Sequence, residues 1–175
     1  MHKGILLAIP LLCILILNSS ANEITIGTQF GVVDCNAVDQ STGYVFGITV
    51  KSRLTRNLAL QAEFSRARLG GVELSFGSRE GSVFNTYTIN ALVGGFVSEY
   101  ERLGYYVSLG IGYHTITRDY DLKRSGLCAN IFVGLEWRLF DRFSIATDIG
   151  NYSRQYSGVY YARLGINYYI KKAVK

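Results

Sequence analysis

Residues 128–139 read Cys128-Ala129-Asn130-Ile131-Phe132-Val133-Gly134-Leu135-Glu136-Trp137-Arg138-Leu139. Every odd-numbered position is apolar, and the positions between them include Asn130, Gly134, Glu136 and Arg138. Successive side chains of a β-strand point to opposite faces. The stretch therefore predicts a strand with one apolar face and one mixed face.

The same alternation recurs along the chain and predicts eight strands, at residues 24–33, 43–54, 58–76, 84–97, 105–117, 127–139, 143–152 and 159–170. The connections 55–57 and 140–142 are tight, whereas 34–42 and 118–126 are long and polar. Short turns on one side and longer loops on the other are typical of outer-membrane barrels. We therefore expect an all-β protein, an eight-stranded antiparallel up-and-down transmembrane β-barrel with both termini on the side of the short turns.

The N-terminal residues have the layout of an export signal. A basic pair, His2-Lys3, precedes the apolar core 5–17, and Ser19-Ser20-Ala21 offers small residues for cleavage. A membrane anchor is the alternative, but this core contains Pro10 and is shorter than the roughly 20 residues that a spanning helix needs. We expect a signal peptide at 1–21 and a barrel domain at 22–175, in the bacterial outer membrane.

Alternation alone does not say which face of the barrel is outside, because a soluble lipocalin-like carrier has its apolar face inward. Volume favours the outward orientation, since an eight-stranded barrel has little internal space. The apolar face carries too many large side chains to fit inside: Ile24, Ile26, Phe30, Tyr44, Phe46, Ile48, Leu58, Leu60, Phe64, Tyr87, Ile89, Val93, Tyr105, Val107, Leu109, Ile111, Tyr113, Trp137, Phe143, Tyr160, Leu164, Ile166 and Tyr168. The other face is rich in glycine, which suits a crowded interior. Aromatic residues near both strand ends also match the two interfacial belts of a membrane barrel.

Six charged residues, three of each sign, have the parity of the interior face: Lys51, Glu63, Glu136, Arg138, Asp148 and Arg163. A register centred on the loop 153–158 places Asp148 nearly opposite Arg163. Charges in a narrow interior must be paired and hydrogen-bonded. We interpret the set as a polar plug that seals and stiffens the barrel, with a narrow ion path as the alternative.

The composition argues against several other functions. Charged residues make up 18% of the chain, the net charge is +5, and no long Lys/Arg run indicates nucleic-acid binding. No His or Cys stands at metal-ligand spacing, and nothing indicates a cofactor. Cys35 and Cys128 have inward parity near the same end, so a disulfide and two thiols both stay open.

An enzymatic function is not expected. His114, with inward parity, is the only histidine after the export signal, and Glu136 and Asp148 have basic neighbours. Lipid A deacylases are eight-stranded barrels with a His-x-Ser pair on a late strand. The similar stretch here reads Asn151-Tyr152-Ser153, so the activating histidine is replaced by asparagine.

Two segments resemble small outer-membrane barrels of the OmpX, attachment-invasion and opacity-protein kind and the barrel half of OmpA. Residues 134–145 look like their penultimate hairpin, with its tight Asp141-Arg142 turn. Residues 163–170 are similar to the signal read by the outer-membrane insertion machinery, although Ile170 and a basic tail replace the usual final aromatic residue.

This resemblance implies a monomer with a surface role in adhesion, host interaction or envelope stability. Its expected partners are outer-membrane lipid, lipopolysaccharide, the insertion machinery and host surface molecules. Binding would fall to the loops 34–42 and 118–126, the latter with Arg118, Asp119, Tyr120, Asp121, Lys123 and Arg124. Solvation, or lipopolysaccharide contact by the basic residues, is the alternative interpretation of those charges. A small channel, a lipid A-modifying enzyme and a lipocalin-like carrier are the alternative functions.

Overall fold

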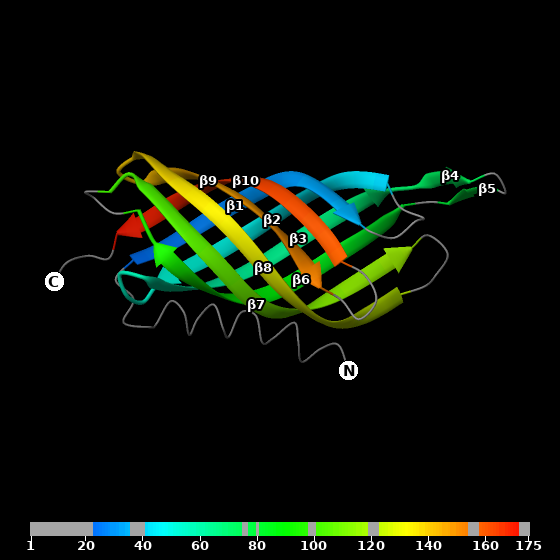
Figure 1. Cartoon of the computed structure of the whole chain (residues 1–175), viewed down its shortest axis with the longest axis horizontal. Helices are drawn as coiled ribbons and strands as arrows, with labels where there is room; N and C mark the ends of the chain where they lie inside the picture. The colour runs from blue at the N-terminus through cyan, green and yellow to red at the C-terminus, as the bar shows by residue number, and fades with distance from the viewer. Residues whose placement is uncertain are drawn as a thin grey trace.

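A computed structural model describes residues 23–35, 41–74, 77–79, 81–97, 101–118, 123–153 and 158–171. Eight long strands form a closed barrel in the order β1-β10-β9-β8-β7-β6-β3-β2, and each neighbouring pair is antiparallel (Figure 1). Their bounds are β1 Glu23–Cys35, β2 Ser41–Arg53, β3 Leu58–Gly70, β6 Ser82–Gly95, β7 Leu103–Arg118, β8 Lys123–Phe140, β9 Phe143–Ser153 and β10 Gly158–Lys171. The predicted up-and-down barrel is confirmed.

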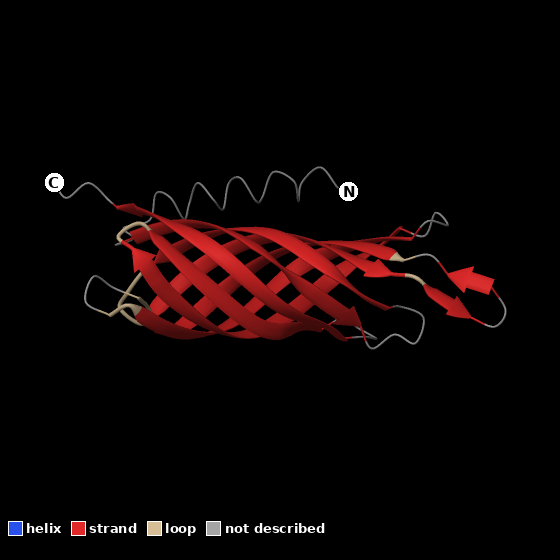
Figure 2. Ribbon diagram, turned by 90° about the horizontal axis from the view of Figure 1, so that it is seen from above, coloured by secondary structure: helices blue, strands red, loops and turns tan. Residues whose placement is uncertain are grey.

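The third predicted strand, 58–76, is longer than the strand in the structure. It ends at Gly70 instead of continuing to residue 76, and the chain then forms a separate two-stranded sheet from β4 (Val72–Leu74) and β5 (Gly77–Arg79). Adjacent glycines at 70 and 71 weaken the strand and allow the backbone to bend. Figure 2 shows this hairpin projecting beyond one end of the barrel.

The two ends of the barrel differ. At one, here called the turn end, the turns 54–57 and 141–142 lie beside the start of β1 and the finish of β10. The opposite end, here called the loop end, carries the β4–β5 hairpin (Figure 1). The arrangement of short turns and strand termini agrees with the prediction.

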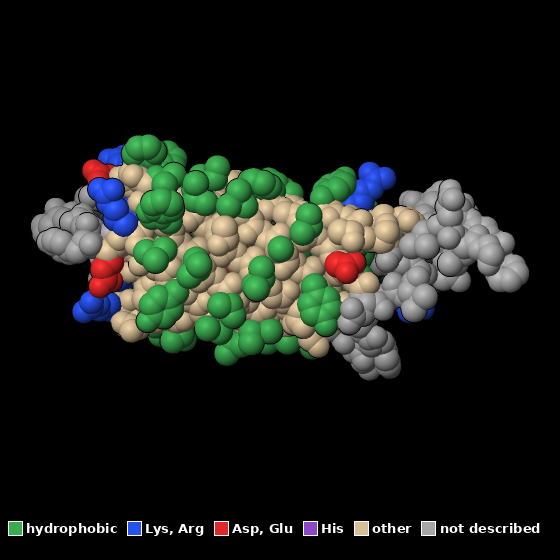
Figure 3. Space-filling model, turned by 45° about the horizontal axis from the view of Figure 1, so that its top comes forward, with side chains coloured by type: hydrophobic (Ala, Val, Ile, Leu, Met, Phe, Trp, Pro, Cys, Tyr) green, Lys and Arg blue, Asp and Glu red, His purple; other side chains and the backbone are tan. Residues whose placement is uncertain are grey.

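Side chains alternate between the outer surface and the interior along each long strand. On β7, Leu103, Tyr105, Leu109 and Ile111 are exposed on the outside, with Ile111 72% exposed. None of the predicted outward residues is buried. The face in Figure 3 shows apolar side chains along the barrel wall, with charged ones toward its ends. The prediction that the apolar face points outward is confirmed.

Aromatic residues gather at the turn end, where Tyr105, Trp137, Phe143 and Tyr168 lie, and the last two have ring centroids 5.2 Å apart. Tyr44, Tyr113 and Tyr160 lie towards the loop end. Phe30 lies further from that end, opposite Phe46 and Leu164.

The interior is filled by side chains. At Gly134 an added Cβ would stand 2.3 Å from Tyr106 Cζ, because the tyrosine of β7 lies over the glycine opposite it on β8. Glycine is therefore required there by close approach. The described residues include no helix with the length and apolar character to cross a membrane.

Candidate functional site

The barrel interior is the candidate site. The structure places the six predicted inward charges, at positions 51, 63, 136, 138, 148 and 163, on the inner face, and each is at most 9% exposed. They come from β2, β3, β8, β9 and β10. They form two clusters, one around Arg163 and one around Glu136.

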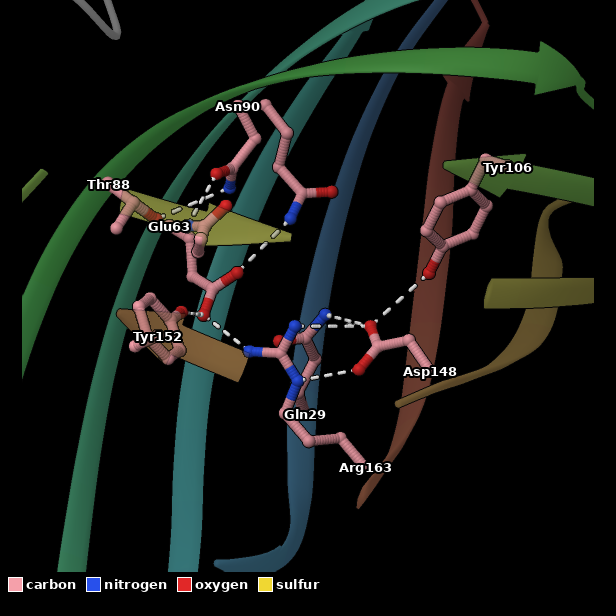
Figure 4. Close-up of polar contacts among 10 residues, drawn as sticks. Gln29, Glu63, Thr88, Asn90, Tyr106, Asp148, Tyr152 and Arg163 are labelled. Atoms are coloured by element: carbon pink, nitrogen blue, oxygen red, sulfur yellow. Dashed lines mark hydrogen bonds and ion pairs between the residues drawn. The ribbon is translucent and has the colours of Figure 1, made fainter. Parts of the chain in front are cut away.

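Arg163 lies at the centre of the first cluster (Figure 4). Its Nε and Nη2 donate to the two carboxylate oxygens of Asp148, at 2.7 Å and 3.2 Å. Its Nη1 donates to Glu63 Oε1 at 2.5 Å. One guanidinium thus bridges two buried carboxylates, and the Phe132 ring lies 4.1 Å from its Cζ.

Neutral donors complete the coordination of these carboxylates. Tyr152 OH donates to Glu63 Oε1 at 2.6 Å, and Gln61 Nε2 donates to the other oxygen at 3.3 Å. Tyr106 OH and Gln29 Nε2 donate to Asp148 Oδ2 at 3.3 Å and 3.5 Å. The two acids therefore have several donors each, as buried charges require.

Glu136, 1% exposed, is the centre of the second cluster, nearer the turn end. Lys51 Nζ donates to its Oε2 at 2.7 Å. Three neutral groups donate to its Oε1: Ser144 Oγ at 2.5 Å, Tyr169 OH at 2.5 Å and Asn167 Nδ2 at 2.8 Å. Both carboxylate oxygens accept hydrogen bonds, and these bonds fix the position of the Glu136 side chain.

Arg138 lies beside the second cluster. Its Cζ is 4.6 Å from the centre of the Tyr169 ring, and its Nη2 donates to the backbone oxygen of Asp141 at 2.5 Å. Its buried Nη1 makes no hydrogen bond with any residue that the structure describes. Further across the interior, Phe96 stacks beneath Lys51 and Arg53, with the cations 5.9 Å and 5.8 Å from its centroid.

The loop-end part of the interior contains a large apolar cluster. A buried cluster consists of Val33, Cys35, Val45, Ala67, Leu69, Phe84, Cys128, Phe132, Tyr152, Val159 and Tyr161. The rings of Phe132, Tyr152 and Tyr161 meet edge to face, with centroids 4.9 Å to 6.4 Å apart. The interior is therefore polar only in part. The two charged clusters lie on the turn-end side of this apolar layer.

The sequence indicated one part of this arrangement and missed another. Asp148 and Arg163 are direct register partners on β9 and β10, as expected. The pairing of Lys51 with Glu136, and of Glu63 with Arg163, crosses the interior between strands that are not neighbours. Parity identifies inward residues but gives no order of contacts across a lumen, so no signal in the sequence could assign these pairs.

The loop candidates are placed only in part. Asp119, Tyr120 and Asp121 lie outside the described residues. The backbones of Arg118 and Lys123 mark the loop-end limits of β7 and β8, and Arg124 is exposed. Most of the loop 34–42 likewise lies outside the described residues, as does the whole segment 1–21.

His114 and Ser153 lie on different sides of the barrel wall. His114, on β7, is buried in the barrel interior, whereas Ser153 is exposed at the loop end of β9. The two strands are separated by β8. The pair therefore has no geometry for proton transfer between them. Among the described residues, no group of three or more His, Cys, Asp or Glu side chains is arranged to hold a metal.

Cys35 and Cys128 both belong to the apolar cluster at the loop end, and each is 6% exposed. The structure holds them as thiols. Their inward parity near one end, expected from the sequence, is what brings β1 and β8 cysteines into the same layer.

Comparison with solved structures identifies the architecture. Neisserial surface protein A matches over 83% of this chain and 96% of its own, with a TM-score of 0.69 and 8% identity. The chain has the fold of the small outer-membrane β-barrels. OprG of Pseudomonas aeruginosa matches over 87% of this chain and 97% of its own (TM-score 0.64, 12% identity). Ail, the attachment invasion locus protein of Yersinia pestis, matches over 85% and 97% (TM-score 0.55, 18% identity). No protein-family model matches the sequence, and neither does any curated protein.

Proposed function

We propose that this protein is an integral outer-membrane β-barrel with a closed interior, which anchors its loop-end connections at the cell surface for adhesion, host interaction or envelope stability. The observation that carries the proposal is the inversion of a soluble barrel: large apolar side chains are outside and six charged ones are inside. On this proposal the turn end faces the periplasm and the protein is a monomer.

The apolar outer surface supports residence in a bilayer. The outward apolar positions of β7 extend from Leu103 to Tyr113. That run matches the roughly 9–11 residues with which a tilted strand crosses the hydrocarbon region. Asp34, Arg66 and Arg68, the outward charges near the loop end, lie beyond the corresponding band on their own strands, at the level of headgroups or lipopolysaccharide.

The interior contacts support closure. The three cations and three carboxylates cancel, and the ion pairs at 2.5 Å to 2.7 Å leave the acids hydrogen-bonded to the wall. A path through the barrel would have to pass the aromatic layer at the loop end as well as these ion pairs. An ion would have to displace both layers, so the arrangement favours a plug over a conducting path.

Surface binding is assigned to the loops 34–42 and 118–126. Ail has also been crystallised with the heparin analogue sucrose octasulfate, in a structure that matches this chain with 18% identity and a TM-score of 0.54. The basic residues Arg118, Lys123 and Arg124 make a polyanionic saccharide the first ligand to test on whole cells. Solvation alone, or lipopolysaccharide contact, predicts no such binding.

Heat modifiability tests the proposal first. The outer-membrane fraction is run on a detergent gel with and without boiling, and the purified protein is recorded in planar bilayers. Two mobilities and no conductance are expected. A single mobility with the protein in the soluble periplasm would favour a lipocalin-like carrier, whereas stepwise conductance would establish a channel.

A further inference from the structure

We propose that the turn end binds the phosphate group of an anionic phospholipid between Arg102, Arg138 and Arg142. The inference rests on the proposed function, because it requires the turn end to lie at the level of the periplasmic headgroups. The three arginines line one open hollow of about 1130 Å³, beside the turn that joins β8 to β9.

A backbone hydrogen bond brings the segment before β7 against the end of β8 and its following turn. Arg102 immediately precedes β7, Arg138 lies near the end of β8, and Arg142 is in the turn. The Arg138 N–H donates to the backbone oxygen of Arg102 at 2.8 Å, and its side chain donates to Asp141 at 2.5 Å. The site is therefore built on the barrel rim itself.

The hollow has unused donors and excess positive charge. Its lining contains three arginines and one carboxylate, Asp141, which gives a net charge of +2. The buried Nη1 of Arg138 and the exposed side chain of Arg102 make no hydrogen bond with a described residue. Arg142 uses Nη1 to reach Tyr168 OH at 3.1 Å and keeps its other donors. The N–H donors of several guanidinium groups can together bond the oxygens of one phosphate group.

Apart from the buried Ser144, the rest of the lining is apolar and lies on the outer wall. It consists of Leu139, Phe140, Phe143, Ile145 and Ile166, with Phe140 71% exposed. This wall continues into the outward apolar band of β8, β9 and β10. A free phosphate would contact only the arginines, whereas a phospholipid would use both halves, its phosphate at the rim and its acyl chains along the wall. The combined lining favours the lipid.

The test is a binding titration of the folded protein in detergent micelles by native mass spectrometry. Phosphatidylglycerol is compared with phosphatidylcholine and with inorganic phosphate. We expect phosphatidylglycerol to bind at least tenfold more tightly than either. Arg102→Gln with Arg142→Gln should lower that affinity at least tenfold. Arg102→Gln alone should lower it about threefold, which keeps the test available should the double variant misfold.

Arg56→Gln is the matched control, because Arg56 is an exposed arginine at the same end whose Nη2 is 3.6 Å from Glu101, and it does not line the hollow. Its affinity for phosphatidylglycerol should stay within twofold of the unchanged protein. Equal binding of the two lipids, unchanged affinity in the arginine variants, or tighter binding of inorganic phosphate would each overturn the inference while heat modifiability still supports the barrel. Loss of heat modifiability in the unchanged protein would overturn both proposals.

Discussion

Lys51 Nζ and Glu136 Oε2 lie 2.7 Å apart across the interior of the barrel, although their strands are not neighbours. β1, β10 and β9 separate β2 from β8 on one side of the wall, and β7, β6 and β3 separate them on the other. The ion pair thus joins opposite walls, and three further donors fix the glutamate in place.

Lys51→Met should destabilise the folded barrel by about 3–5 kcal/mol, because it leaves the buried Glu136 carboxylate without its cation. The free energy of unfolding is measured by urea titration in lipid vesicles. Arg56→Met, which removes an exposed pair, should cost less than about 1 kcal/mol. Adding Glu136→Gln to Lys51→Met should recover much of the loss. Equal effects of the two single variants would mean that the buried pair contributes nothing special.

The two interior layers predict an unusual conductance pattern. Tyr161→Ala opens only the apolar layer and should leave planar-bilayer recordings silent, because the ion pairs below are intact. Adding Glu63→Ala, Arg163→Ala, Lys51→Ala and Glu136→Ala removes the ion pairs of both charged clusters and should produce conductance. Current through Tyr161→Ala alone would show that the charged clusters do not close the path by themselves.

Gly134→Ala should destabilise the protein by about 1–3 kcal/mol through overpacking against Tyr106. Gly158→Ala is the control, since the nearest atom to a Cβ there is 3.7 Å away. The comparison uses urea midpoints in the same vesicles. Tyr106→Ala should relieve much of the added cost of Gly134→Ala, and strict additivity of the two changes would argue against the contact.

A charge on the outer wall should test its lipid exposure. Leu109→Lys, in the middle of the outward band of β7, should cost about 2–4 kcal/mol in bilayers. Thr117→Lys, on the same face near the loop end, should cost less than about 1 kcal/mol. Vesicle unfolding and the yield of the heat-modifiable form give the measurement. A penalty independent of position would place β7 outside the hydrocarbon.

Much of the architecture could be predicted from side-chain parity. A strand has period two, so residues such as Ile111 and Glu136 could be assigned to faces without knowledge of their neighbours. A register centred on the loop 153–158 also placed Asp148 nearly opposite Arg163, and the two are register partners in the structure.

Contacts across the lumen were beyond the same reasoning. Whether Lys51 meets Glu63 or Glu136 depends on the tilt and stagger of all eight strands, which no local pattern encodes. The break at Gly70 was also missed, because alternation continues into β4 although its pairing partner changes. The hollow at the rim combines the segment before β7, the end of β8 and the turn after it, and no sequence motif marks this combination.

The sequence distance between the paired interior charges constrains the order of assembly. Lys51 is separated from Glu136 by 85 positions, and Glu63 from Arg163 by 100. A partial sheet that entered hydrocarbon as its strands emerged would expose the early charges to lipid before their partners existed. The wall must therefore curl nearly shut, with β10 approaching β1, while its concave side is still wet. The ion pairs then form late in assembly. A truncated chain without the last strand should stop as an open, curved sheet whose concave face is still hydrated.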